Sequence, residues 1–174
     1  MTDETSSPED NAAAGAAPEE AQSIQFSMQR VYVKDVSFEA PIGVLAIKPG
    51  FQPQVNQDLG TKVNKVADDL FEVVLNLTVT VSTEDKKTAF LVEVQQAGLF
   101  MLKAPEGAPI QQILSSQCPS MLFPYARELI DSLVVRGGFP PLMLPAINFD
   151  ALYAQAVSQA QKKAEAEAGS KTQQ

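Results

Sequence analysis

The sequence predicts an α+β protein in which antiparallel strands come first and helices follow. From residue 24 to about residue 102, apolar side chains recur at every second position, the period of a half-buried strand. After Pro109 they recur at helical spacing instead. With 174 residues, the chain is long enough for one domain with a sizeable core.

The first two strands are predicted between residues 24 and 66. Apolar and polar residues alternate over 24–28 and, after a disturbance, over 36–40, and Pro41 ends this strand. A loop rich in proline and glycine follows. A weaker alternation over 55–66 predicts a more exposed strand, interrupted at Gly60.

The clearest strand covers residues 71–82. Its odd positions are apolar and most even positions are polar, so one face is expected to be buried and the other wet. A short polar connection, 83–87, leads into a second β-rich segment, 88–102. We expect the two segments to form an antiparallel hairpin.

The remainder is expected to be helical. Pro109 suits the first turn of a helix, which Pro119 and Pro124 should break or restart. An apolar stripe over 122–134 recurs at helical spacing and must pack on something, and Gly137–Gly138 supplies a helix stop.

An apolar loop and a last helix complete the chain. Three prolines keep 139–147 out of regular structure. Asn148 can cap the last helix, with Asp150 favourably placed in its first turn. After Ala160 a frayed end is expected, so we assign 161–174 as a flexible C-terminal tail.

The charge is concentrated at the N-terminus. Residues 1–22 hold six of the acidic residues and no Lys or Arg, so most of the net charge of −8 lies there. Because large apolar groups are also scarce, this tail is expected to be disordered, which leaves 23–160 as a single domain. It lacks the features of a secretory signal, and no run approaches the roughly 20 apolar residues that span a bilayer. Net acidity without a basic cluster argues against nucleic-acid binding.

The composition also excludes much catalytic and metal chemistry. There is no His, hence no Ser-His-Asp triad and no imidazole metal ligand. The single Cys118 can close no intrachain disulfide and supply no thiolate zinc cage, so a reducing cytoplasm is the expected setting. No phosphate-binding glycine motif occurs, and Asp68–Asp69 is interpreted as a solvated turn. We therefore expect no enzymatic activity, metal or cofactor.

Two binding surfaces remain as candidates. Asp35 and Glu39 would share a face with Leu91 and Glu93 if their strands lie in one sheet. From the residues alone, an ordinary wet sheet face is favoured over a docking surface for a basic partner. The apolar loop 139–147 either tucks beneath the helices or lines a groove, and both interpretations stay open.

Four segments, in this order along the chain, are specific enough to indicate a protein family: QRVYVKDVSFEAP (29–41), AFLVEVQQAG (89–98), CPSMLFPYARE (118–128) and PAINFDAL (145–152). Together they resemble the SecB family of bacterial protein-export chaperones. The resemblance implies a four-stranded antiparallel sheet with helices on one side, assembled as a homotetramer that is a dimer of dimers. It also implies that the protein binds unfolded precursor proteins without ATP and passes them to the SecA motor.

The resemblance assigns roles to residues. The SecA-docking surface carries over onto Asp35, Glu39, Leu91 and Glu93, and any zinc belongs to SecA. Residues expected to contribute to client binding, the two valines as floor or dimer contact, are Phe51, Val92, Val94, Phe139, Leu142, Phe149, Leu152 and Tyr153. Residues of the helical stripe assigned to core and tetramer packing are Leu122, Tyr125, Leu129 and Leu133.

Some positions depart from the family pattern. Phe51 stands where the family usually has Trp, Lys86–Lys87 makes the hairpin tip basic, and the Lys-containing C-terminus is not the acidic tail of familiar members. Three alternatives remain: a SecB-like chaperone dedicated to a partner such as a toxin–antitoxin system, a small-molecule carrier or enzyme using the apolar groove, and a purely structural tetramer.

Overall fold

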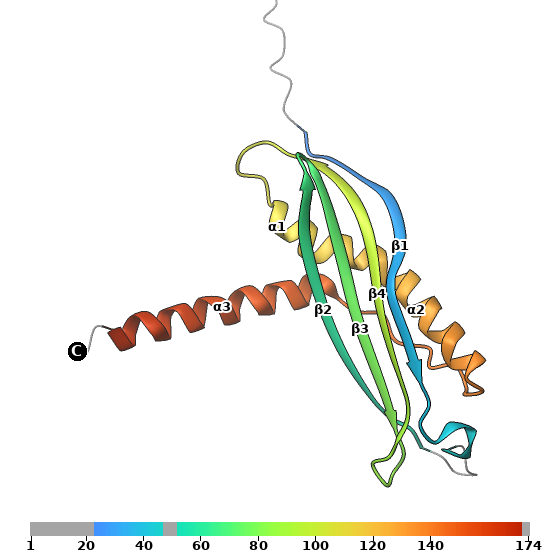
Figure 1. Cartoon of the computed structure of the whole chain (residues 1–174). Helices are drawn as coiled ribbons and strands as arrows, with labels where there is room; N and C mark the ends of the chain where they lie inside the picture. Colours follow the sequence, from blue (N-terminus) through green and yellow to red (C-terminus); the bar gives the residue numbers. More distant parts are fainter. Residues whose placement is uncertain (1–22, 47–51, 172–174) are drawn as a thin grey trace, which may run out of the picture.

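The computed structural model describes residues 23–46 and 52–171, and it confirms the α+β class (Figure 1). Four long strands precede the helices. Their bounds are β1 (Gln25–Glu39), β2 (Gln54–Ala67), β3 (Leu70–Ser82) and β4 (Thr88–Lys103), with the short 3-10 helix η1 (Gly43–Ala46) after β1. The helical part consists of α1 (Ile110–Gln112), the π-helical turn η2 (Ile113–Gln117), α2 (Cys118–Arg136) and α3 (Phe149–Lys171).

The strands form one antiparallel sheet in the order β1-β4-β3-β2. The predicted hairpin of β3 and β4 is confirmed, and β1 and β2 are the two edges. β1 shifts register twice along β4, between Met28 and Arg30 and between Val33 and Asp35, where the sequence predicts a disturbance. The expected interruption of β2 at Gly60 is wrong. Gly60 pairs with Asn76 inside an unbroken ladder, because backbone hydrogen bonds to β3 hold this edge strand whatever its side chains.

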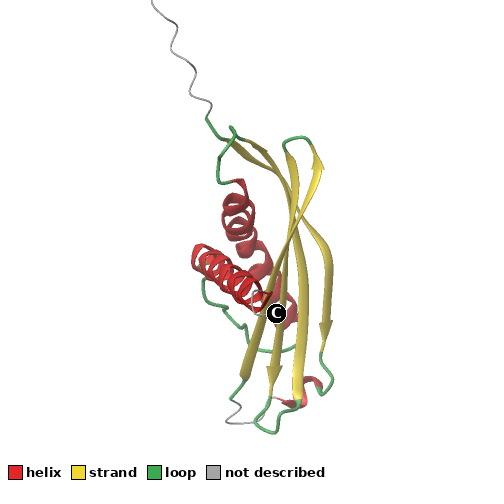
Figure 2. Cartoon of the chain, turned by 90° about the vertical axis from the view of Figure 1, so that its left-hand side faces the viewer, coloured by secondary structure: helices red, strands yellow, loops and turns green. Residues whose placement is uncertain are grey.

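The helices cover one face of the sheet (Figure 2), which we call the inner face. Side chains of β3 and β4 at alternate positions pack there against α2, and Leu122, Ala126, Ile130 and Val134 of α2 are fully buried. Gly98 of β4 permits the closest approach: a Cβ there would lie 2.6 Å from Phe100 Cε2 and 2.8 Å from Leu122 Cδ2. Only glycine fits between the strand and the helix at this point.

Helical structure runs from Ile110 to Arg136 through a π-helical turn, and α2 begins at Cys118, so the restart expected at Pro119 is confirmed and the break expected at Pro124 is wrong. Pro119 falls in the first turn of α2, directly after the π-helical turn. The backbone hydrogen bonds change there from the π-helical to the α-helical pattern, so the missing N–H of Pro119 is tolerated. Pro124 lies inside α2 but is exposed. Packing of the opposite face of α2 on the sheet offsets the lost hydrogen bond.

The predicted stop after α2 is confirmed. Gly138 has φ +83°, the Gly138 N–H bonds to the Val135 carbonyl at 3.0 Å, and the Phe139 N–H bonds to the Val134 carbonyl at 3.1 Å. These are the two bonds of a Schellman motif. They turn the chain back along α2 towards the start of α3.

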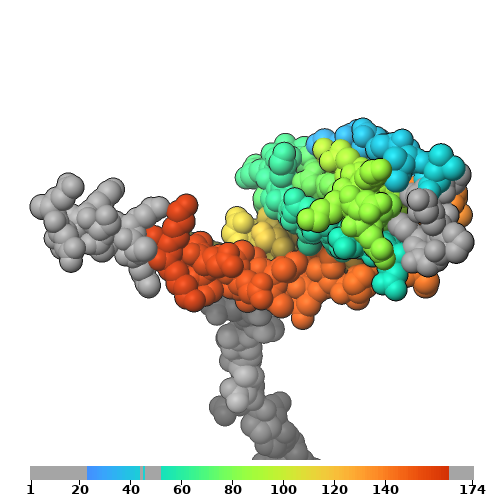
Figure 3. Space-filling model, turned by 90° about the horizontal axis from the view of Figure 1, so that it is seen from below, coloured from blue at the N-terminus to red at the C-terminus, as the bar shows by residue number. Residues whose placement is uncertain are grey.

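Helix α3 begins as predicted but continues further than expected. Asn148 Oδ1 accepts a hydrogen bond from the Ala151 N–H at 2.9 Å, which is the predicted cap. Beyond Ala160 the helix runs on to Lys171 and extends past the β2 edge of the sheet (Figures 1 and 3). Ala, Glu, Lys and Gln are strong helix formers, so the composition that suggested fraying also supports a helix. The predictions for the acidic tail 1–22 and for Phe51 concern residues outside the described ranges.

Candidate docking and client-binding surfaces

The structure brings the four predicted docking residues together on the sheet face that the helices leave uncovered, which we call the outer face. In the β1–β4 ladder, Glu39 lies opposite Leu91, and Ser37 lies opposite Glu93. Asp35 comes next along β1, opposite Gln95. Asp35 and Glu39 belong to β1, whereas Leu91 and Glu93 belong to β4. The pairing of these two strands therefore creates the surface, which we call the acidic patch (Asp35, Glu39, Leu91 and Glu93).

The charges of the acidic patch are not neutralised. Its three carboxylates are exposed, and among the described residues the ion pairs are Lys34–Glu72 and Lys65–Asp68, neither of which involves the patch. The Ser37 hydroxyl donates one hydrogen bond of 3.3 Å to Glu93. Leu91 is half-buried between these groups. Uncompensated acidic charge around an apolar contact can steer a basic peptide and then hold it.

A second cluster on the outer face, which sequence reasoning missed, centres on Glu72 of β3. The Tyr32 hydroxyl donates to Glu72 Oε1, Lys34 Nζ lies 2.8 Å from Oε2, and Asn64 Nδ2 donates to Oε2 at 2.9 Å. Hydrogen bonds from Lys34, Tyr32 and Asn64 lower the pKa of Glu72 to about 2. The hydrogen bond to Glu72 raises the pKa of Tyr32. The partners come from β1 and β2, so no local pattern could have revealed this cluster.

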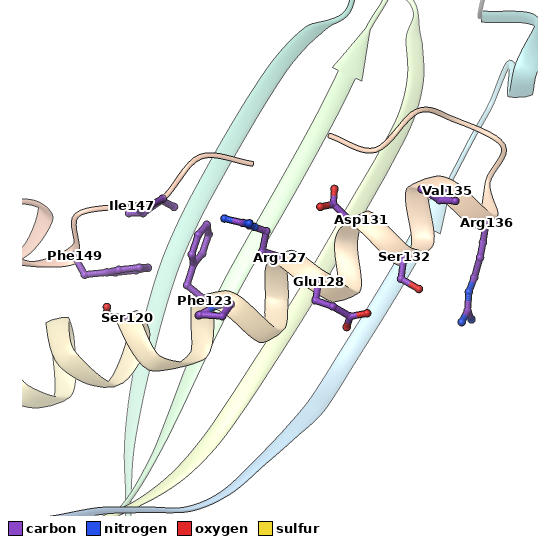
Figure 4. Close-up of a pocket in the computed structure, with 12 residues that line it drawn as sticks. Ser120, Phe123, Arg127, Glu128, Asp131, Ser132, Val135, Arg136, Ile147 and Phe149 are labelled. Carbon is purple, nitrogen blue, oxygen red and sulfur yellow. The ribbon is translucent and has the colours of Figure 1, made fainter. Parts of the chain in front are cut away.

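On the helix side, an open groove lies between α2 and the loop that leads into α3 (Figure 4). We call it the helix-side groove; its lining includes Phe123, Pro124, Arg127, Asp131, Val135, Ile147 and Phe149. Phe123 and Phe149 meet edge to face, with ring centroids 5.9 Å apart. The groove is therefore apolar at one end and charged at the other, without the convergent polar groups that orient a small molecule.

Polar contacts fix the loop that forms one wall of the groove. Asp131 Oδ1 of α2 accepts hydrogen bonds from the backbone N–H groups of Leu142 and Met143, both at 3.1 Å. The hydroxyl of buried Ser116, in the π-helical turn, donates to Asp150 Oδ1 at 2.5 Å. Because the two contacts lie at the middle of the loop and at the start of α3, they set the width of the groove.

The predicted client-binding residues do not form one surface. Phe149 lines the groove, Leu142 and Tyr153 are half-buried, and Leu152 is exposed. Residues Val92, Val94 and Phe139 belong instead to the core. The rings of Phe139 and Phe90 lie 4.7 Å apart beneath α2, and Phe139 is only 3% exposed. In this conformation these three side chains offer a client no surface, and Phe51 lies outside the described residues.

The four residues predicted for core and tetramer packing also differ in their burial. Leu122 is 0% exposed and belongs to the core of this chain, with no surface left for a partner. Leu129 and Leu133 are half-buried, whereas Tyr125 is 47% exposed on the opposite side of α2. Sequence periodicity identified the helix but not which of its apolar residues face outward, because the stripe is wider than the sheet contact.

The remaining reactive groups fit structural roles. Burial raises the pKa of Cys118 to about 12, so its thiol stays protonated at neutral pH. Asp68 and Asp69 form the β2–β3 turn, in which Asp68 pairs with Lys65 at 3.0 Å. None of the helices among the described residues is long and apolar enough to cross a membrane.

Comparisons with known proteins agree on one family. The model of the family described as preprotein translocase subunit SecB matches residues 19–160. The protein-export protein SecB of Cellvibrio japonicus is 52% identical over 167 residues, covering 96% of this chain and 95% of the relative. The protein of the same name from Saccharophagus degradans is 53% identical over 156 residues, covering 90% of both.

A solved structure supports the fold independently. The SecB-like chaperone of Mycobacterium tuberculosis, determined in complex with a peptide from an antitoxin, aligns with a TM-score of 0.61 at 16% identity. The alignment covers 70% of this chain and 90% of that one. At this identity the likeness concerns the four-stranded antiparallel sheet and its helices.

Proposed function

The chain belongs to the SecB family of protein-export chaperones, and from this premise we propose that it holds unfolded precursor proteins in the cytoplasm without ATP and delivers them to the SecA motor. The observation that carries the delivery step is the meeting of Asp35, Glu39, Leu91 and Glu93 on the uncovered sheet face. Those are the positions onto which the family's SecA-docking surface maps. Their exposed carboxylates suit the basic, zinc-binding tail of SecA.

Client capture belongs to the other side of the molecule. The helix-side groove offers Pro124 and Ile147 above the buried rings of Phe123 and Phe149. Met143 of the loop and Leu152 of α3 are further exposed apolar side chains on the helical part of the chain. An unfolded client loses entropy at each contact, so one groove binds weakly. We propose that the protein works as a homotetramer, in which four grooves raise affinity through effective concentration. The exposed apolar residues Tyr125 and Val135 of α2 supply contact area for that assembly.

The test is capture of a denatured precursor. On dilution from denaturant, a stoichiometric amount of the protein should suppress aggregation without nucleotide, because the groove shields the client's apolar segments. Replacing Tyr153 and Leu152 by Ser should raise the amount of protein needed roughly tenfold, which corresponds to about 1.4 kcal/mol. Light scattering measures this directly.

The matched control is Val157→Ser, which removes an apolar side chain further along the exposed part of α3 and should change little. Size-exclusion chromatography with light scattering checks that each variant keeps its oligomeric state. Undiminished capture by the double variant would remove Leu152 and Tyr153 from the client surface. Absence of suppression by the wild type would point to a carrier or a structural assembly instead.

A further inference from the structure

The outer face of the sheet carries the acidic patch towards one end. From the middle of the sheet to the other end, where β1 begins and β4 finishes, the same face carries exposed cationic side chains, which we call the basic end: Arg30, Lys34, Lys62 and Lys103. The carboxylates of this region are Glu72, which pairs with Lys34, and Asp68 and Asp69 of the β2–β3 turn. The net charge of −8 gives no sign of the basic end. Neither does any short stretch of sequence, because the four cations come from three strands.

The register places these cations on the outer face. Arg30 lies opposite Leu99, next to Phe100, which is buried on the inner face. Lys62 lies opposite Val74, between two inner-face residues of β3. Because side chains alternate along each strand, Arg30 and Lys62 share the face on which Tyr32 and Lys34 meet Glu72. Lys103 follows buried Leu102 and points to that same side.

Most of this positive charge is free to bind a partner. Among the ion pairs of residues 23–46 and 52–171, only Lys34 of the basic end takes part, through Glu72. A shallow depression lined by Gln29, Arg30, Tyr32 and Leu99 opens beside these cations, and Met101 nearby is 39% exposed. Free cations around an apolar contact suit a peptide that carries carboxylates among small apolar residues.

Such a peptide is attached to this end of the sheet. Residues 1–22 contain six carboxylates, no cation and many alanines, and β1 starts three residues later, with Gln25 opposite Lys103. Extended, 22 residues reach about 70 Å, whereas the 14 residues of β2 span about 45 Å. The segment can therefore reach every cation of the basic end. Tethering gives it an effective concentration in the millimolar range, so even a weak affinity is sufficient.

We propose that the acidic segment 1–22 docks on the basic end of its own chain. Docked there, it neutralises Arg30, Lys62 and Lys103 and leaves the acidic patch uncovered. Of the basic end, the outer face then presents only Lys34, already paired with Glu72, to an approaching basic peptide, which would otherwise be repelled there. The docking itself does not depend on the proposed chaperone function.

Zero-length cross-linking with a carbodiimide tests the proposal, because the reagent joins a carboxylate to an ammonium group only when they are in contact. In the full-length protein, peptide mass spectrometry should find Glu4, Glu9 or Asp10 joined to Lys62 and Lys103. Lys86 and Lys87, in the β3–β4 turn at the opposite end of the sheet, serve as the internal control. Raising the salt from about 0.1 M to about 1 M shortens the Debye length from about 10 Å to about 3 Å and should reduce these cross-links roughly tenfold.

A pair of variants separates docking from general attraction. Arg30→Glu should reduce the cross-links of the segment to Lys62 and Lys103 severalfold, whereas Lys86→Glu, an equal change in net charge, should leave them intact. Equal cross-linking of the wild-type segment to Lys86 and Lys87, or no response to Arg30→Glu, would overturn the proposal. Mixing isotope-labelled with unlabelled chains identifies the donor of the segment. If the segment's cross-links join different chains, or if Lys62 joins Glu93 of another copy, the occupant is a second copy and the proposal is wrong.

Discussion

At the scale of single residues, Glu72 shows how a side chain on the face of a sheet that the helices leave uncovered can stabilise the fold. Its carboxylate accepts hydrogen bonds from three side chains, and its side chain is only 14% exposed. These donors favour the ionised form and hold the pKa of Glu72 near 2, below the ordinary value of 4.5. Ionised Glu72 therefore stabilises the folded state.

This predicts a pH dependence of stability. Because the folded-state pKa is depressed, the contribution of Glu72 is complete above about pH 4.5 and is lost as the pH falls towards 2. Glu72→Gln should lower the free energy of unfolding by about 1–2 kcal/mol at neutral pH and should make stability less sensitive to acid. Urea unfolding at neutral pH and at about pH 3 measures both effects.

The matched control is Glu84→Gln, which changes an exposed carboxylate in the β3–β4 turn. It should leave the acid sensitivity unchanged. If Glu72→Gln and the wild type lose the same stability between the two pH values, the hydrogen bonds of Glu72 make no net contribution to folding.

Sequence reasoning succeeded at this scale where a residue's role follows from its neighbours along the chain. Asn148 was predicted to cap α3 and does so, and Gly137–Gly138 ends α2 as expected. The Glu72 cluster and the Asp131 contacts could not be predicted, since their partners lie eight or more residues away along the chain. Phe139 was predicted to line the client-binding surface but lies in the core, because an apolar loop residue can face either way.

At the scale of elements, the alternation of apolar and polar residues predicted β1, β3 and β4 well, because every second side chain of a half-buried strand faces the core. The helix containing Pro119 was predicted less well. A π-helical turn rearranges hydrogen bonds before the proline, and burial against the sheet stabilises a helix that the local sequence weakens. Such tertiary compensation is not visible in the order of residues.

The loop between α2 and α3 provides a prediction at this scale. Asp131→Ala removes the acceptor that holds the Leu142 and Met143 amides, so the loop wall of the helix-side groove should open more often. We expect amide hydrogen exchange at these two residues to accelerate about tenfold, the equivalent of about 1.4 kcal/mol.

Glu128→Ala is the appropriate comparison, because Glu128 is an exposed acidic residue one turn earlier on α2 with no hydrogen bond to the loop. Its exchange rates should match those of the wild type. Unchanged exchange in Asp131→Ala would show that apolar packing of Leu144 and Phe139, rather than Asp131, holds the loop.

At the scale of the whole molecule, the sheet separates two tasks. Its inner face packs against the helices to form the core, with the helix-side groove between α2 and the loop, whereas the described helices leave the outer face, with its acidic patch, uncovered (Figure 2). If the proposed site assignments hold, a client and SecA can bind at the same time without competing for surface. This division could not be predicted from composition, because both faces are built from the same four strands.

Charge reversal tests the outer face. Asp35→Lys with Glu93→Lys should weaken SecA binding at least about tenfold and should reduce its salt dependence, because the steering charges are inverted. Titration calorimetry at two salt concentrations measures both quantities, and client capture should be unaffected. Glu84→Lys with Asp85→Lys, in the β3–β4 turn, makes an equal change in net charge and should bind SecA nearly as well as the wild type. Equal weakening by both pairs would reduce the acidic patch to a contributor to net charge.

The position of Glu72 has a consequence for how the sheet assembles. Its three donors lie on the two edge strands, Tyr32 and Lys34 on β1 and Asn64 on β2. Strand β2 pairs directly with β3, whereas β1 is separated from β3 by β4. A slip of one residue in the β1–β4, β3–β4 or β2–β3 ladder would turn at least one donor to the opposite face. The cluster therefore forms only when all three ladders are aligned, and the depressed pKa of a single carboxylate reports whether the whole sheet has the correct register.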